Sequence, residues 1–450
     1  MPHGRMGHVP TRLGQQLTRL IPPTPLSRRL ATQSLLFATG EGTFMTGSAV
    51  FFTQVVGLRA TRVGLGLTVA AVAAFLVAYP MGRLTDRIGP KRMWALGALV
   101  QALMFAVWPF IDGFTGYLAM IVVVEIFENA AEAGRNAYVL NVMPQKERIE
   151  TQAYLYSSLN VGFTLGAIIG GVALALDDLA VMRWLPLFTM VIGLVNAVRI
   201  RSLPDAPHDL HRRVRGGPQP AAAPGPGPLR NPGWMLVSLF NGTLWTNQVL
   251  LNVVIPLWLV QETDSPHWLL AWLFGTNTVL CIVLPAYTSQ GVRSVGDALR
   301  RVRYSAGFFV LSCLITMVTH STVGLLTVVL VWLGHVTVTG AELAVSSASW
   351  TFQAKLMDSR RRGEYGGVAE VFATLGKGWA PAAYTFLAMG WHPPGPAGLG
   401  WLVIGAIVLA ATLGMHPAAH AAERFLDRHG LAEQDATRPG ADAGTMPEPA

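Results

Sequence analysis

A stripe of charged residues lies within an otherwise apolar stretch at residues 116–141. It places Glu125, Glu128, Glu132 and Arg135 among alanine, valine, isoleucine and phenylalanine. At about 100° per residue, the four side chains fall within about 80° of one helical face. Three acids against one base leave at least one carboxyl without a counter-ion, and a desolvated carboxyl of this kind tends to hold a proton. The stripe therefore predicts a proton-coupling site, with a static network around Arg135 as the alternative.

A further acid, Glu41, lies between two glycines in the apolar stretch 32–57. If both stretches are helices reaching the same side of a membrane, Glu41 and Glu132 each lie about 13 Å from that side and Arg135 about 9 Å. The matching depths predict one inner cluster of these three residues, with the other two acids of the stripe farther out. Alternatively, the glycines beside Glu41 serve only close helix packing.

Ionisable residues also occur in the apolar stretches near the C-terminus. Glu342 and Lys377 are expected at depths of about 15–17 Å, where they could form a buried ion pair or take part in coupling. Glu364 and Glu370 lie closer to the edge and are expected to form a latch or a helix cap. His335 is expected to be a satisfied buried histidine rather than a coupling group.

Uncharged polar side chains and aromatic rings gather in the stretches 234–259 and 322–352. This mixture suits a bulky amphipathic compound better than a sugar or a phosphate. The alternative is hydrogen bonding between helices. The predicted lining of a substrate cavity is Trp245, Asn247, Gln248, Asn252, Trp332, His335 and Glu342.

The composition indicates which elements position these residues. Of 450 residues, 52% are hydrophobic and 13% charged, with a mean hydropathy of +0.42, whereas a soluble chain has about a quarter charged residues. Runs of about twenty apolar residues recur, each long enough to cross a bilayer as a helix, and open strands in lipid would leave backbone groups unpaired. We predict an all-α membrane protein with twelve transmembrane helices, over residues 32–57, 63–81, 93–111, 116–141, 152–176, 183–200, 234–259, 267–288, 304–319, 322–352, 366–389 and 398–415.

The basic residues indicate how these spans are oriented. Every Lys and Arg falls on one side of the predicted membrane, apart from three in outer loops and two within spans, namely Arg59, Arg62, Arg183, Arg135 and Lys377. Basic residues mark cytoplasmic segments, so both termini are expected in the cytoplasm of a plasma-membrane protein. The net charge of +8 then needs no nucleic-acid partner.

A segment rich in Pro, Gly and Arg divides the spans six and six, and its composition predicts a linker without a packed core. The expected organisation is a cytoplasmic tail at 1–31, a six-helix bundle at 32–200, a cytoplasmic linker at 201–233, a second six-helix bundle at 234–415 and a cytoplasmic tail at 416–450 with a short helix around 423–429. Cys281 and Cys313 lie within spans, so neither a disulfide framework nor a metal cluster is expected.

The loop after the second span reads Gly82-Arg83-Leu84-Thr85-Asp86-Arg87-Ile88-Gly89-Pro90-Lys91-Arg92. It resembles the Gly-x-Leu-x-Asp-Arg-x-Gly signature of the major facilitator superfamily, whose two six-span halves are related by pseudo-symmetry. The resemblance implies a conformational latch between the halves. Its expected members are Gly82, Asp86, Arg87, Gly89 and Arg92.

A second motif, at residues 162–171, places glycines about every four positions, which lets a neighbouring helix approach closely. It resembles the fifth-span signature of drug/proton antiporters, the exporters of this superfamily. Two departures are present, because Ala167 replaces the proline of that signature and Glu125 stands where such antiporters carry arginine. The expected packing face consists of Gly162, Gly166, Gly170 and Gly171.

The resemblance implies a secondary active transporter that moves a small amphipathic molecule across the membrane by alternating access. Proton-coupled export, as in multidrug efflux, is the leading expectation. No cofactor is expected, with the proton as coupling ion, and we expect a monomer whose partners are its small-molecule substrate and the lipid bilayer. An importer or facilitator on the same fold, or a sensor that does not transport, remains an alternative. An enzyme is not expected, because no catalytic constellation or ATP-binding P-loop occurs in the sequence.

Overall fold

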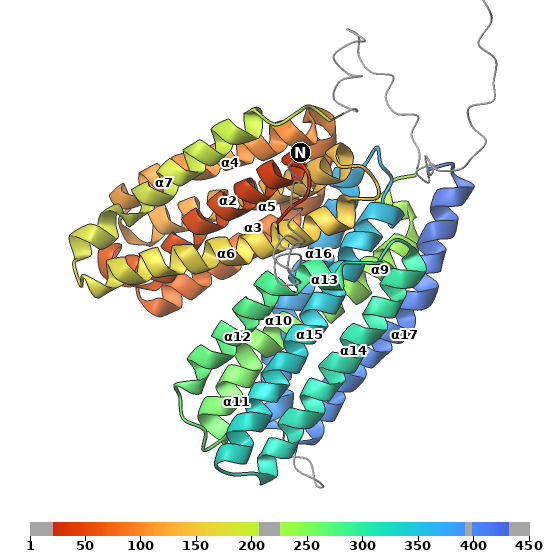
Figure 1. Cartoon of the computed structure of the whole chain (residues 1–450). Coiled ribbons are helices and arrows are strands. Elements are labelled where there is room, and N and C mark those ends of the chain that lie inside the picture. The colour runs from red at the N-terminus through yellow and green to blue at the C-terminus, as the bar shows by residue number, and fades with distance from the viewer. Residues whose placement is uncertain (1–20, 207–225, 392–397, 432–450) are drawn as a thin grey trace, which may run out of the picture.

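The computed structural model describes residues 21–206, 226–391 and 398–431, and its regular elements within these ranges are helices. Figure 1 shows two groups of helices that meet at one end and diverge toward the other. The chain passes from the first group to the second at the end where they meet, which we call the linker end. The opposite end is the open end. We call the two groups the N half and the C half.

The N half contains six long helices, with a π-helical turn after the first and a short 3₁₀ turn after the third. They are α2 (Pro25–Val50) with η1 (Phe51–Val55), α3 (Ala60–Ile88), α4 (Pro90–Val107) with η2 (Trp108–Phe110), α5 (Gly113–Val142), α6 (Arg148–Ala175) and α7 (Leu179–Arg201).

The C half also contains six spans, two of which are built from several pieces. After the turn η3 (Pro228–Arg230), the first span comprises α9 (Pro232–Leu244), α10 (Asn247–Val249), η4 (Leu250–Val254) and α11 (Ile255–Glu262). The others are α12 (Leu269–Val283) with α13 (Pro285–Thr288), α14 (Val295–Val318) with η5 (Thr319–Ser321), α15 (Leu325–Leu356), α16 (Arg362–Thr385) with η6 (Phe386–Gly390), and α17 (Leu399–Arg428).

Nine helical segments of the described chain are long and apolar enough to cross a membrane, and α12 is apolar but shorter. The helices α2 and α16 complete twelve, and both carry charged residues in mid-span, such as Glu41 and Lys377. The predicted fold, an all-α membrane protein with twelve transmembrane helices in two bundles, is confirmed.

Several boundaries differ from the predicted ones. The first helix begins at Pro25 because Thr24 and Ser27 form a reciprocal capping box, with Ser27 N–H donating to Thr24 Oγ1 over 3.2 Å. The last helix continues to Arg428, so the predicted separate short helix is part of α17. The remainder of the predicted tails and linker, residues 1–20, 207–225 and 432–450, lies outside the described residues.

The two halves differ in how their interiors are packed. One continuous cluster of buried apolar side chains fills the C half, from Trp234 to Ala422. The N half instead has separate clusters, one around Leu30 at the linker end and another of aromatic rings around Phe44 at the open end. Glu41 lies between these two positions on α2, so a polar level interrupts the apolar interior of the N half.

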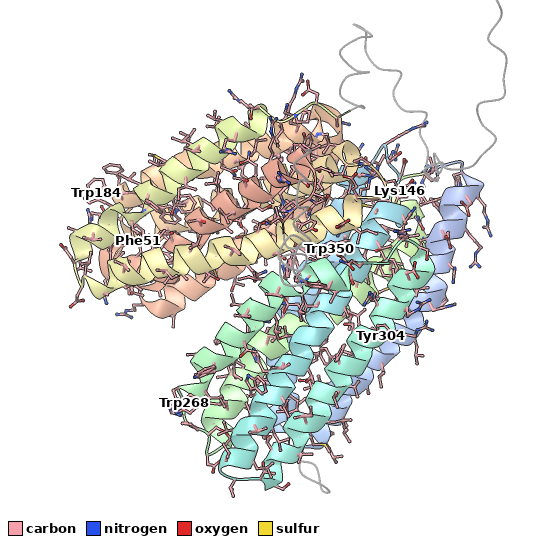
Figure 2. All side chains as sticks on the ribbon, in the orientation of Figure 1. Phe51, Lys146, Trp184, Trp268, Tyr304 and Trp350 are labelled. Carbon is pink, nitrogen blue, oxygen red and sulfur yellow. The ribbon has the colours of Figure 1, made fainter. Side chains whose placement is uncertain are left out.

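Figure 2 shows the side chains of the two halves. Phe51 and Trp184 lie toward the open end of the N half, and Trp268 lies toward the open end of the C half. Trp350 lies where the halves approach each other, and its ring is 5.8 Å from that of Tyr156 in α6. The principal contacts between the halves join α3 and α5 to α16, and α6 to α12, α13 and α15.

Candidate functional site

A pair of carboxyl groups from different helices shares one amide donor inside the N half. The Nε2 group of Gln101, in α4, donates to Glu41 Oε2 over 3.4 Å and to Glu128 Oε2 over 3.3 Å. Gln101 is buried, with 6% of its surface exposed. We call Glu41 and Glu128 the carboxyl pair, and Gln101 is the bridge between them. Because an amide carries no charge, this arrangement does not neutralise either acid.

The pair corrects the predicted inner cluster of Glu41, Glu132 and Arg135. Since α2 begins at Pro25, Glu41 lies about 24 Å along its helix from the linker end, much deeper than predicted. Glu128 lies about 21 Å from the end of α5. The two depths match, so Glu41 meets Glu128 rather than Glu132.

The other charged residues of the stripe have local partners. Glu132 pairs with Arg135 one turn away, at 3.6 Å, and 57% of the Glu132 side chain is exposed. Glu125 accepts from Asn129 Nδ2 over 3.3 Å and lies within electrostatic range of both members of the carboxyl pair. The stripe therefore divides into an exposed ion pair and a deeper group of acids without a directly bonded cation in the described chain.

Charged groups of the C half face this stripe from α16. Lys377 is exposed and acts electrostatically on Glu128 and on Glu370. Glu370 in turn lies within electrostatic range of Glu125 and Glu132. Glu370 therefore lies near acids of α5 as well as Lys377 of its own helix, and its predicted role in a latch or cap stays a prediction. Lys377 is thus within electrostatic range of one acid from each half, Glu128 of the N half and Glu370 of the C half.

Glu342 also differs from its predicted surroundings. It is 4% exposed, and it accepts from Asn277 Nδ2 over 3.0 Å and from the hydroxyl of Tyr156. The possible Glu342–Lys377 ion pair is not found among the described contacts. Tyr156 belongs to α6 and Glu342 to α15, so this hydrogen bond joins the two halves.

The predicted substrate-cavity residues do not form a single exposed surface. His335 and Asn247 are fully buried, and no described partner is found for either ring nitrogen of His335 or for the side-chain amide of Asn247. This corrects the expectation that His335 is satisfied. Trp332 Nε1 donates to Thr276 Oγ1 over 3.1 Å.

The remaining polar residues of this group lie where the seventh span is interrupted. Trp245 Nε1 donates to Ser349 Oγ over 3.1 Å, while Gln248 accepts from Asn252, which is exposed. The predicted single helix over 234–259 is therefore broken after Leu244, and its polar residues bond chiefly within the C half.

The loop motif brings the halves into direct contact at the linker end. Asp86 Oδ1 accepts from Gly363 N–H and Asp86 Oδ2 from Glu364 N–H, each over 2.8 Å. These N–H groups lie in the first turn of α16, where backbone donors have no partner within the helix and negative charge is favoured. A side chain on Gly82 would collide with the backbone of Gly363. Arg83 adds an ion pair with Glu364 at 3.3 Å.

The other residues of the predicted latch have different surroundings. Gly89 adopts a φ of 101° at the junction of α3 and α4, a conformation that favours glycine. Arg87 and Arg92 are exposed, and neither has an ion pair among the described residues. No hydrogen bond or ion pair from either side chain to α16 is found among the described residues, so neither is shown to take part in the contact between the halves.

The glycine motif of α6 packs against α2. Added Cβ atoms on Gly162, Gly166 and Gly170 would each fall within 3.0 Å of the α2 backbone or its Cβ atoms. An added Cβ on Gly171 would meet nothing within 4 Å. Gly171 is therefore not part of the packing face, since it lies about 100° around the helix from Gly170.

The two sequence motifs thus lie at close helix contacts, one between the halves and one between α2 and α6. A comparison of the whole sequence with protein families agrees with the resemblance that these motifs suggested. The model of the Major Facilitator Superfamily matches residues 30–381. The chain belongs to this superfamily. It is therefore a multi-pass membrane transporter and not an enzyme.

Solved structures of transporters have the same fold. An outward-facing bacterial homologue of the iron transporter ferroportin is 14% identical, with a TM-score of 0.66 over 89% of this chain and 99% of that chain. The proton:xylose symporter XylE is 13% identical, with a TM-score of 0.66 over 90% and 96%. The fucose:proton symporter FucP of E. coli, as a variant, is 15% identical, with a TM-score of 0.67 over 87% and 98%. No curated protein sequence matches the chain.

Three residues of the transporter site were missed by the sequence reasoning. Gln101 is a lone amide in an apolar run, and Asn277 is another, so both carried a usable signal. Tyr156 carried none, because its hydroxyl becomes important only when α6 meets α15. In the part of the chain that the structure describes, no group of three His, Cys, Asp or Glu residues is suited to hold a metal ion.

Proposed function

We propose that this transporter exports a small amphipathic cation from the cytoplasm in exchange for protons. The observation that carries the proposal is an excess of acids among neighbouring charged residues of α2, α5 and α16. Five carboxylates accompany two cations in this group, and these residues are Glu41, Glu125, Glu128, Glu132 and Glu370, with Arg135 and Lys377.

A cationic substrate and a proton can compete for such a group of acids. When the cation enters, it supplies the positive charge that the deeper carboxyls lack, and their proton is released. When the cation leaves, a proton neutralises the same carboxyls, because an unpaired charge is costly in the membrane interior. The transporter then returns without substrate. This competition is the minimum requirement for exchange.

Basic residues are concentrated in the segments at the linker end, which supports the proposal that this end faces the cytoplasm of a plasma-membrane protein. The glycine face between α2 and α6 resembles that of exporters, which supports outward transport. Proton-coupled import remains the second candidate, since Ala167 and Glu125 both depart from the exporter pattern.

Reconstituted vesicles can test both directions. The probes are tetraphenylphosphonium and ethidium, which are permanent cations, with xylose as a neutral probe, while potassium and valinomycin clamp the membrane potential. We expect the cations to accumulate in vesicles with an acidic lumen, and the lumen to become more alkaline as they enter. Vesicles without protein and vesicles with Glu128→Gln should show neither change.

The reverse result would identify the second candidate. Accumulation only in vesicles with an alkaline lumen indicates symport, and accumulation of xylose in place of the cations contradicts the proposed substrate class.

A further inference from the structure

A cavity lies inside the N half on the far side of Glu41 from α6. It is lined by residues of α2, α4 and α7, among them Glu41, Gln101, Thr189 and Asn196. About 20 Å³ of it can hold the centre of a water molecule, and a single water needs roughly 10–15 Å³. The cavity is therefore large enough for water and has polar partners for it.

Buried polar atoms without a described partner continue from the cavity toward the linker end. Asn196 Oδ1, Gln33 Oε1 and Ser34 Oγ are such atoms, and each of the three residues is 2% exposed. Gln33 uses its other group, Nε2, to donate to the backbone oxygen of Asn196 over 3.5 Å. Buried polar groups are rarely left without a partner, so these atoms are natural water ligands.

These groups form a polar path along one face of α2, which we call the N-half seam. Gln33 lies about 12 Å from the start of α2 and Glu41 about 24 Å. Asn196 and Thr189 are about 10 Å apart on α7, and both line the cavity. The seam therefore leads from the carboxyl pair about half of the way to the linker end.

An apolar cluster closes the seam at the linker end. Leu30 and Ile200 are fully buried there, and Leu203 and Ala197 pack with them. On its other side, Glu41 is linked through Gln101 to Glu128, which is influenced by Lys377 of the C half. Glu125 of α5 is the further charged group near Glu41. The seam itself contributes no other charged side chain.

We propose that the N-half seam binds water and conducts the coupling proton between Glu41 and the linker end. A proton leaves Glu128 for Glu41 through water beside Gln101 and then passes to water in the seam, while the amide holds the two carboxyls together. Proton and substrate thus cross the linker end by different routes. The identity of the proton as coupling ion rests on the proposed function, whereas the hydration of the seam does not.

Removing the apolar barrier tests this route without any substrate. Purified Ile200→Ser protein is placed in vesicles with an internal pH-sensitive dye, and the decay of an imposed pH gradient is followed. We expect proton leak at least tenfold faster than in the parent protein. The matched control is Ile404→Ser in α17, since Ile404 is equally buried in the continuous core of the C half.

A second substitution shows whether the leak uses the seam. Asn196→Leu, combined with Ile200→Ser, should return the leak to within about twofold of the parent rate. A leak that persists in this double variant, or that is equally fast in Ile404→Ser, overturns the proposal. A parent protein that shows no coupled transport, together with a seam-dependent leak, would contradict the proposed function and leave the seam intact.

Thiol chemistry detects the water even if Ile200→Ser does not fold. Ser34→Cys protein is treated with a small water-soluble methanethiosulfonate, and the rate of labelling is measured. The labelling of the parent protein, whose Cys281 and Cys313 are buried, is subtracted as background. The control is Ser305→Cys, because Ser305 is equally buried but its hydroxyl donates to Ala341 O over 2.8 Å. We expect labelling at least tenfold faster at position 34, and equal rates overturn the proposal.

Discussion

The two halves of this transporter share an architecture but handle buried polarity in opposite ways. In the N half, ionisable residues interrupt the apolar interior, so that Glu41 and Glu128 meet between two separate clusters. In the C half the apolar cluster is continuous, and the buried acid Glu342 has only uncharged partners in Asn277 and Tyr156.

This difference indicates a division of roles between the halves. Acids that share a neutral bridge gain or lose a proton with little change in packing, because no ion pair must be broken. An acid that accepts a hydrogen bond at each carboxyl oxygen resists protonation, since the added proton would leave one of the buried donors unpaired. We therefore expect coupling to depend on the N half and the relative position of the halves to depend on contacts such as Tyr156–Glu342.

The largest expected effect separates the two acids. Glu128→Gln should lower accumulation of the cation probe against its gradient at least a hundredfold, while downhill exchange continues, because the side chain can no longer bind and release a proton. Glu342→Gln should lower accumulation about threefold or less. Vesicle assays with an imposed pH gradient measure both. Equal defects in the two variants would break the comparison between the halves.

A second comparison lies within α5, between Glu132 and Glu128. Glu132 is held by Arg135 and is largely exposed, so its loss should reduce accumulation much less than that of Glu128. If Glu41→Gln, Glu125→Gln, Glu128→Gln and Glu132→Gln all retain gradient-dependent accumulation, the stripe is structural and coupling lies elsewhere.

The next effect concerns the close packing of α6 against α2, on the face of α2 that is turned away from the N-half seam. Gly166→Leu forces a side chain into the backbone of α2 at Thr39 and Thr43, and overpacking of this kind costs about 1–3 kcal/mol or more. The melting temperature of purified protein should fall by about 1–3 °C or more. Gly171→Leu is the control, and it should be unchanged. Equal stability of both variants contradicts close packing at Gly166.

The sequence predicted the helices better than it predicted which side chains of different helices are in contact. Apolar length and basic flanks were sufficient for the spans, since lipid imposes these features on each helix separately. The partner of Glu41 was predicted incorrectly because an error at the start of α2 shifted its depth by about 10 Å. Asp86 was identified by its motif, whereas Tyr156 depends on contact between distant helices and had no local signal.

A smaller effect is expected at the linker end. Asp86→Asn removes the charge that favours the start of α16 and leaves one of two N–H groups facing an amide, which costs about 1.5–3 kcal/mol. Transport should fall about tenfold, and the amount of protein in the membrane should not change. Arg87→Gln is the matched control, since Arg87 makes no described contact with α16. Normal transport by Asp86→Asn would remove the proposed latch role.

The smallest effect tests the hydrogen bond between Tyr156 and Glu342. Tyr156→Phe keeps the aromatic contact with Trp350 but removes the hydroxyl, and a hydrogen bond of this kind contributes about 0.5–1.5 kcal/mol. Because the bond is made while the open ends are apart, its loss should lower the population of that state by about twofold to tenfold. Spin labels on cysteines at Trp184 and Trp268, both exposed near the open end, report this population as the long-distance fraction. The control is Tyr304→Phe, at an exposed position of α14. An unchanged distance distribution in Tyr156→Phe would show that the bond does not favour either state, and the C half would then lack its expected role in setting the relative position of the halves.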